Sequence, residues 1–317
     1  MSSSEVANET ILHTLVRVYS AQIEELKRES SGMTYFAHFF SPDLEAVGAK
    51  GEKISDAQAD DYCKVYLLGV LERCHITSIA SLARTNGWLA SSVSELENRN
   101  LLGFSASLRG LLEATADTHD AAAVMTEHLY NLFPFIYLRL QGNNTAPSVI
   151  LQLLEDKLIH YSYAHWQAKR SETLPEHTNK LNSEYIDAIE KSGAAGAKDL
   201  YRVLCDLTHP AAPSVSCFLK ETEREITLDF SQVKRIINEI ISDYEETIKS
   251  LVSNTVNSAL VSLVVLRKLG YDVPAPNPSS FAGVGGVAKI FSCIDAFLLK
   301  ASNEGFVFSN DMWHHKL

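Results

Sequence analysis

The chain has 317 residues, of which 46% are hydrophobic and 21% charged, and its formal net charge at pH 7 is −11. This balance is typical of a globular protein that can bury a substantial core. The acidic charge argues against a broad DNA-binding surface, because binding along the phosphate backbone needs Lys and Arg to displace its counterions. We therefore expect no DNA partner.

The five cysteines form no CxxC pair, and their number is odd. They predict neither a disulfide framework nor a zinc site, and free thiols fit a reducing cytoplasm. The start, MSSSEVANET, lacks the basic and apolar regions of a signal peptide. The most apolar run, 259–266, is shorter than the roughly 20 residues that span a bilayer. We expect a cytoplasmic protein with no membrane contact, no cofactor and no metal.

The first fifty residues predict one amphipathic helix and a linker. Ile11, Leu15 and Leu26 recur at helical spacing. A polar stretch with two glycines, 48–53, then separates this helix from the rest of the chain.

Two long helices are expected next. Ser55 and Gln58 form a capping-box signature, and the helix that they open should run toward Asn86, with Gly87 as its stop. In the central part of the following segment, 98–119, apolar or small residues would occupy almost every side of the helix. This pattern predicts a buried helix.

Shorter helices are expected in the middle of the chain. The stretch 121–140 has helical character, and Pro134 should kink or break it. Further helices are predicted over 148–170 and 184–190.

After Pro213 the pattern changes. The alternating residue pattern and the β-branched residues allow a small β-hairpin near 215–230. The other interpretation is an irregular loop. A helical pattern from Ser231 to Leu269 is long enough to contain a break. A last helix should begin near Val287.

These elements predict an all-α fold, a multi-helix bundle of more helices than a minimal bundle needs. We expect an N-terminal helix and linker over 1–50 and a main helical domain over 51–270. A loop and a helix packed on that domain should follow over 271–317.

Arg109 and Glu113 are the only charges in the central part of the predicted buried helix. Their i,i+4 spacing puts both side chains on one helix face. A buried ion pair is costly unless further hydrogen bonds satisfy it. The pair therefore indicates either a structural bridge to another helix or a polar site inside the bundle.

The segment LYRVLCDLTHP, 200–210, carries a second polar face. Arg202 and His209 are seven residues apart, so in a helix they differ by only ~20° around the axis and by ~10 Å along it. Asp206 falls between them. Pro210 disfavours helical geometry at His209, which should therefore be the last helical residue or the cap.

These motifs resemble those of HEPN domains, whose all-helical proteins carry an Arg-x4-6-His motif. More closely, LRGLLEA and LYRVLCDLTHP resemble an uncharacterised bacterial helical family with an Arg-x3-Glu helix and a later Tyr-x2-Leu…His-Pro helix. The corresponding positions in this chain are Arg109, Glu113, Tyr201, Leu204 and His209.

The HEPN resemblance implies a HEPN-like core of four or five helices, here with additional helices, in proteins that are often homodimers. Active HEPN proteins are metal-independent endoribonucleases, in which a ribose 2′-hydroxyl attacks the adjacent phosphorus of RNA. By this resemblance His209 would be the general acid or base, and Arg202 would stabilise charge on the phosphoryl oxygens.

This chain departs from active HEPN proteins in two respects. Val203 follows the arginine where active members carry a polar residue, and Asp199 and Asp206 would repel a phosphate unless they are paired. Many HEPN-like proteins are binding modules. Two functions stay open: a non-catalytic HEPN-like binding or interaction module with an Arg/Glu/His cluster, or an endoribonuclease acting as a toxin or phage-defence effector.

Overall fold

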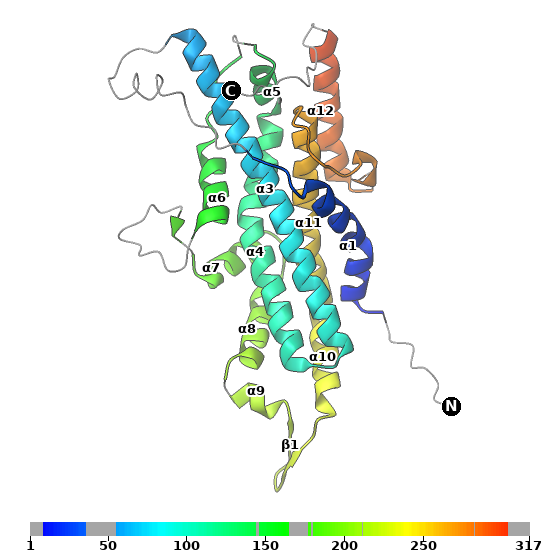
Figure 1. The fold of residues 1–317 in the computed structure, drawn as a ribbon. Coiled ribbons are helices and arrows are strands. Elements are labelled where there is room, and N and C mark those ends of the chain that lie inside the picture. Colours follow the sequence, from blue (N-terminus) through cyan, green and yellow to red (C-terminus); the bar gives the residue numbers. More distant parts are fainter. Residues whose placement is uncertain are drawn as a thin grey trace. The chain divides into compact units, whose positions relative to one another are not determined.

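The protein is a mainly helical bundle with one small antiparallel hairpin, as a computed structural model shows (Figure 1). The structure describes residues 9–35, 55–143, 146–164, 177–178, 180–210, 212–281 and 283–303. The prediction of an all-α multi-helix fold with a small hairpin is confirmed.

The long helices are α1 (Ile11–Ser30), α3 (Asp56–Glu97), α4 (Leu101–Asn131), α11 (Glu245–Lys268) and α12 (Gly285–Asn303). The shorter ones are α5 (Phe133–Leu140), α6 (Gln152–Tyr163), α7 (Asn182–Lys191), α8 (Ala197–Thr208), α9 (Ala212–Ser216), α10 (Gln232–Asp243) and the 3₁₀ helix η2 (Pro278–Phe281). The strands are β1 (Leu219–Glu221) and β2 (Ile226–Leu228).

The chain divides into two compact units, each assembled from three separate segments. Unit 1 comprises Met1–Glu25, Ser81–Asp120 and Lys180–Asn257, and unit 2 comprises Leu26–Ala80, Ala121–Asn179 and Ser258–Leu317. The long helices α3, α4 and α11 each contribute residues to both units. The three-part division expected at 50/51 and 270/271 stays a prediction.

Unit 1 is built around the first two-thirds of α4. Phe104, Leu108 and Leu112 are almost completely buried there, which confirms the buried helix expected over this segment. Gly110 allows a close approach, because a Cβ at this position would lie 2.8 Å from the indole ring of Trp88 on α3. The Thr255 hydroxyl on α11 donates to the Thr115 carbonyl of α4 at 3.3 Å.

Unit 2 buries the most apolar run of the chain. In α11, Leu263, Val265 and Leu266 have no exposed surface. The rings of Phe133 and Phe297 meet edge to face, with centroids 6.0 Å apart. Apolar burial of this kind is the main stabilising term in folding.

The prediction that Gly87 stops the second helix was wrong, since α3 continues to Glu97. A glycine inside a helix costs only about 1 kcal/mol relative to alanine. Burial of Leu82 and Leu89 on either side of Gly87 outweighs that cost.

Two expected breaks are present. Helix α4 ends at Asn131 and α5 begins at Phe133, with Pro134 in its first turn. The helix expected over 231–269 is interrupted at Tyr244, which separates α10 from α11. Of the helix expected over 148–170, the structure shows α6; the part from 165 onward lies outside the described residues.

Helices α3 and α11 are long and apolar enough, by length and composition alone, to cross a membrane. Their most apolar windows are 56% and 67% buried inside the protein. Core helices of soluble proteins pass the same test, so the cytoplasmic location expected from the sequence stays a prediction.

A buried histidine lies in unit 2. His75 of α3 is fully buried, and a 2.7 Å hydrogen bond joins its Nδ1 to the hydroxyl of Tyr35. The ring of Tyr271 meets the imidazole edge to face at 6.2 Å. Burial lowers the pKa of His75 from 6.5 to about 4, so the imidazole is neutral in the folded protein at neutral pH.

This histidine should make the protein sensitive to acid. Between pH 6.5 and about 4 the histidine of the unfolded chain binds a proton that folded His75 does not bind. The free energy of unfolding therefore decreases by about 1.4 kcal/mol for each pH unit of acidification. The loss totals about 3 kcal/mol. His75→Asn should reduce the slope of unfolding free energy against pH, measured by urea denaturation. A residual slope of the same sign is expected because burial also lowers the pKa of His119. An unchanged slope in His75→Asn would contradict this account.

Candidate functional site

The candidate site is centred on an ion pair of α4 in unit 1. Arg109 Nε donates to Glu113 Oε1 at 2.9 Å across one helical turn. Their side chains are 23% and 28% exposed, so solvent screens the pair only in part. Burial acts to lower the pKa of Arg109, but the hydrogen bond and the charge of Glu113 raise it above its usual value. The guanidinium is therefore a permanent cation.

Helix α8 places its side chains over this pair. It begins after Gly196, which has a φ of +86° and packs against the Thr247 hydroxyl in a close approach that a side chain would block. The ring of Tyr201 lies 5.5 Å from the Arg109 guanidinium, and its hydroxyl donates to Glu113 Oε1 at 3.2 Å. Burial raises the pKa of this hydroxyl, and the charge of Glu113 adds to the effect.

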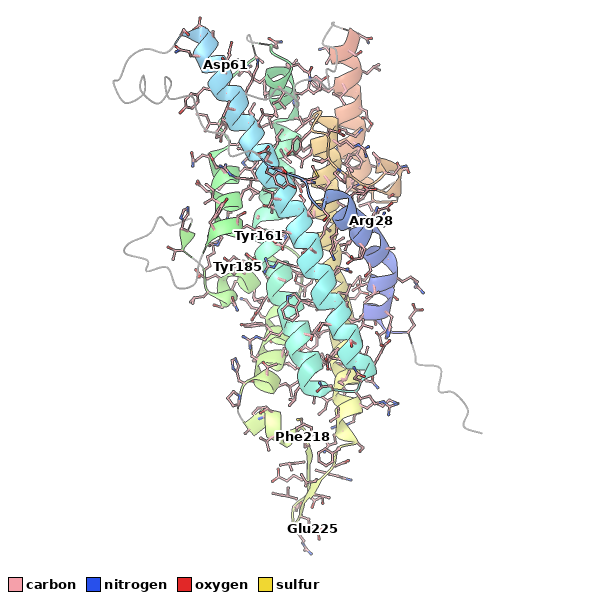
Figure 2. The ribbon with its side chains drawn as sticks, viewed as in Figure 1. Arg28, Asp61, Tyr161, Tyr185, Phe218 and Glu225 are labelled. Carbon is pink, nitrogen blue, oxygen red and sulfur yellow. The ribbon has the colours of Figure 1, made fainter. Side chains whose placement is uncertain are left out.

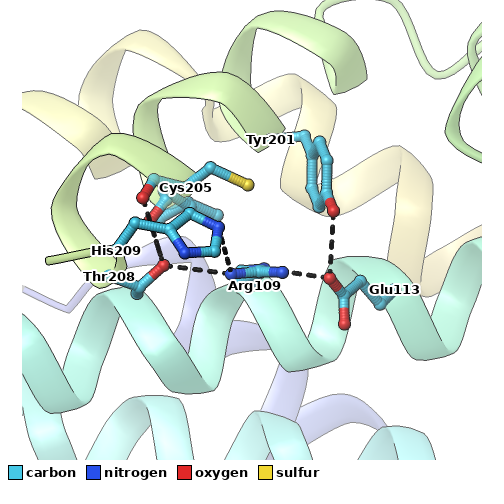
Figure 3. A network of polar contacts seen from close by, with 7 residues as sticks. Arg109, Glu113, Tyr201, Cys205, Thr208 and His209 are labelled. Carbon is cyan, nitrogen blue, oxygen red and sulfur yellow. Dashed lines mark hydrogen bonds and ion pairs between the residues drawn. The ribbon is translucent and has the colours of Figure 1, made fainter. Parts of the chain in front are cut away.

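The C-terminal end of α8 supplies the other contacts. Arg109 Nη1 donates to Thr208 Oγ1 at 3.2 Å and lies 3.3 Å from His209 Nε2 (Figure 3). Thr208 is the last residue of the helix, and its hydroxyl donates to the Leu204 carbonyl at 2.8 Å. His209 is the C-cap, with extended backbone angles as expected before Pro210.

The contact with Arg109 defines the hydrogen-bonding state of His209. A guanidinium has donors and no acceptor, so a hydrogen bond between these groups requires Nε2 to accept. The tautomer that allows this hydrogen bond carries its proton on Nδ1.

The structure separates Arg202 from this network. Arg202 lies on the exposed side of α8, where its side chain is 71% exposed and pairs with Asp199 at 3.2 Å. Asp206 is also exposed, and the contacts described for the cluster do not include it. Of the candidate residues, the network unites Arg109, Glu113, Tyr201 and His209. The cation beside His209 is therefore Arg109 of another helix, and Arg202 has a different partner.

A shallow hollow of about 250 Å³ lies next to His209. Its walls come from α4, the end of α8, α9 and the segment that joins these two helices. They are lined by Leu102, Ala106, Leu207, Thr208, His209, Pro210 and Ser214. The hollow is smaller than the usual pocket for a drug-sized ligand, about 300–1,000 Å³, and suits one side chain or a small molecule.

Sequence reasoning missed Thr208. Its hydroxyl accepts from Arg109 and so completes the network. A threonine directly before the capping residue of a polar helix end could have been considered, because Ser and Thr hydroxyls often bond near helix ends.

No protein-family model, curated protein or solved structure matches this chain. Among the residues that the structure describes, no group of three or more His, Cys, Asp or Glu side chains could hold a metal ion.

Replacing Arg109 should lower the free energy of unfolding more than replacing Arg202. Arg109→Met leaves Glu113 without its cation and removes the donors to Thr208 and His209, so we expect a loss of about 1–3 kcal/mol in unfolding free energy. Arg202→Met breaks only an exposed pair and should cost less than about 0.5 kcal/mol. Chemical denaturation of both variants measures the difference. Equal losses would show that the Arg109 network does not stabilise unit 1.

Proposed function

We propose that this chain is a non-catalytic, HEPN-like helical module that acts by binding. Its Arg109–Glu113–Tyr201–His209 network holds the end of α8 against α4, and the hollow beside His209 is its binding surface. The module has no cofactor and acts in the cytoplasm. Its ligand is a small polar group or one side chain of a partner protein.

The observation that supports this proposal is the hydrogen bond between Arg109 and His209. A general base must offer a free lone pair to the proton that it removes, whereas Nε2 of His209 accepts from a guanidinium. Arg202, the cation of the Arg-x6-His spacing, is paired with Asp199 in solvent. These contacts of His209 and Arg202 favour a binding role over phosphoryl chemistry.

The hollow combines apolar and polar walls. Leu102, Ala106 and Pro210 supply apolar groups, and Thr208 and Ser214 supply hydroxyl groups. Leu102 is 42% exposed, which is high for a large apolar side chain in a folded monomer. A small polar group, or a side chain that carries a hydrogen-bonding atom on an apolar stem, would match this lining.

The alternative function, a metal-independent endoribonuclease, has one observation in its favour. His209 is exposed at the rim of an open hollow, and a guanidinium lies 3.3 Å from its ring. If RNA displaced that contact, His209 could take the 2′-hydroxyl proton while the 2′-oxygen attacks phosphorus to form a cyclic phosphate, and the 5′-oxygen leaves with a proton taken from water. Arg109, rather than Arg202, would then stabilise the phosphoryl oxygens.

An RNA cleavage assay in EDTA separates the two functions. We expect no cleavage by the wild-type protein, together with a lower melting temperature for His209→Ala because the acceptor for Arg109 is lost. Metal-independent cleavage that disappears in both His209→Ala and Arg109→Met would establish the nuclease instead. Arg202→Met serves as the control, since its melting temperature should match the wild type.

The binding surface is tested by filling the hollow. Ala106→Gln adds a neutral side chain in a residue type that favours helix, so the fold should be retained. A partner that co-purifies with the wild-type protein should be lost with Ala106→Gln and kept with Arg202→Met. Retention of every partner by Ala106→Gln would exclude the hollow as the binding surface.

A further inference from the structure

The hollow beside His209 lies at the C-terminal end of α8, where the backbone lacks hydrogen-bond donors. The last carbonyl groups of a helix have no partner within the helix. Pro210 has no N–H and so cannot donate to the carbonyl of Asp206, and the extended backbone of His209 ends the helix there. Among the residues that the structure describes, no backbone N–H donates to the carbonyl of Asp206, Leu207 or Thr208.

These unpaired carbonyl groups favour a cationic ligand. Helix carbonyls point toward the C-terminal end, where their aligned dipoles amount to about half a negative charge. An ammonium group at this end would donate to the unpaired oxygens and interact favourably with the dipole. The same oxygens would repel a carboxylate or a phosphate.

The walls of the hollow fit the stem of a long side chain. Leu102, Ala106, Leu207 and Pro210 give it an apolar lining, and its volume of about 250 Å³ has room for one such side chain. Lysine packs its four methylene groups on apolar surface and keeps its charged head at the edge. A lysine stem would also cover part of Leu102, which is 42% exposed.

The charged groups at the end of α8 favour a cation as well. Asp206 is exposed on the last turn, and it forms no ion pair with the residues that the structure describes. Arg202, one turn before it, is paired with Asp199. The charge of Arg109 is balanced by Glu113. The charge that stays unbalanced at the end of α8 is therefore negative.

Unit 1 as a whole is acidic. It has 22 Asp and Glu residues against 13 Lys and Arg residues, so it carries nine of the eleven excess negative charges of the chain. Among the acidic residues, Glu223 and Glu225 lie in the turn between β1 and β2, and Figure 2 labels Glu225 at that end of the hairpin. A field of this sign attracts a basic segment of another protein and speeds its encounter with unit 1.

We propose that the hollow binds a lysine side chain from a basic segment of a partner protein. The stem packs on the apolar walls, and the ammonium donates to the unpaired carbonyls at the end of α8, beside Asp206. Lysine suits this site better than arginine, because its three donors diverge from one atom, whereas the flat guanidinium matches a carboxylate or a phosphate. The inference rests on the proposed binding function and names the group that the hollow recognises.

Titration of the full chain with short peptides tests the inference. The probes are acetyl-AAKAA-amide and its counterparts with acetyl-lysine or arginine in the central position. The lysine peptide should shift the backbone amide signals of Leu207, Thr208 and Ser214 in a saturable manner. The acetyl-lysine peptide should bind at least ~10-fold more weakly, because acetylation removes the charge. The arginine peptide should also bind more weakly than the lysine peptide.

Three variants locate the binding site. Ala106→Gln fills the hollow and should abolish binding of the lysine peptide. Asp206→Asn removes an exposed charge without changing the shape of the side chain, and it should weaken binding about 3-fold. The matched control is Asp243→Asn at the end of α10, which removes an exposed charge elsewhere in unit 1 and should leave the affinity unchanged.

Equal binding of the lysine and acetyl-lysine peptides would overturn the inference, as would arginine binding as tight as lysine binding or unaltered binding by Ala106→Gln. A wild-type protein that does not bind the lysine peptide would overturn it too. The proposed binding function would still stand in that case if a co-purifying partner were lost with Ala106→Gln. That function itself fails if Ala106→Gln keeps every partner or if the wild-type protein cleaves RNA.

Discussion

In unit 1, the ion pair between Arg109 and Glu113 lies in a part of α4 that is otherwise buried on most sides. In α4, Arg109 and Glu113 lie among apolar and small side chains, and partial removal from water is unfavourable for both charges. Their mutual hydrogen bond satisfies only part of the guanidinium. The remaining N–H groups of the guanidinium need acceptors, and Thr208 and His209 at the end of α8 provide them. These contacts, together with the complete burial of Leu200 and Leu204, hold α8 against α4.

In this arrangement the two residues of the Arg-x6-His spacing do not act as a pair. In a straight helix the two residues of the motif share a face, but sharing a face does not bring their charged groups together over two turns. Arg202 binds the carboxylate one turn before it, and His209 binds a cation from a different helix. The same residue types thus form two separate contacts, and only one of them is part of the network beside the hollow.

Local patterns were sufficient to predict most of the helices. Periodicity indicated α1, α4, α7 and α12, and proline chemistry indicated the break before Phe133. The extent of α3 could not be predicted from local patterns, since Gly87 is a good terminator by itself and only the burial of its neighbours in the folded protein overrides it. For the site, spacing within one helix correctly paired Arg109 with Glu113. The partner of His209 is one hundred residues away, and no spacing rule covers a contact of that kind.

The protonation pattern of His209 tests the central claim most directly. Long-range proton–nitrogen correlation spectra of the imidazole at neutral pH report which ring nitrogen carries the proton. If Arg109 donates to Nε2, His209 is neutral with its proton on Nδ1, and Arg109→Met should abolish this preference. A wild-type spectrum in which Nε2 carries the proton would contradict the network and the account of α8 that depends on it.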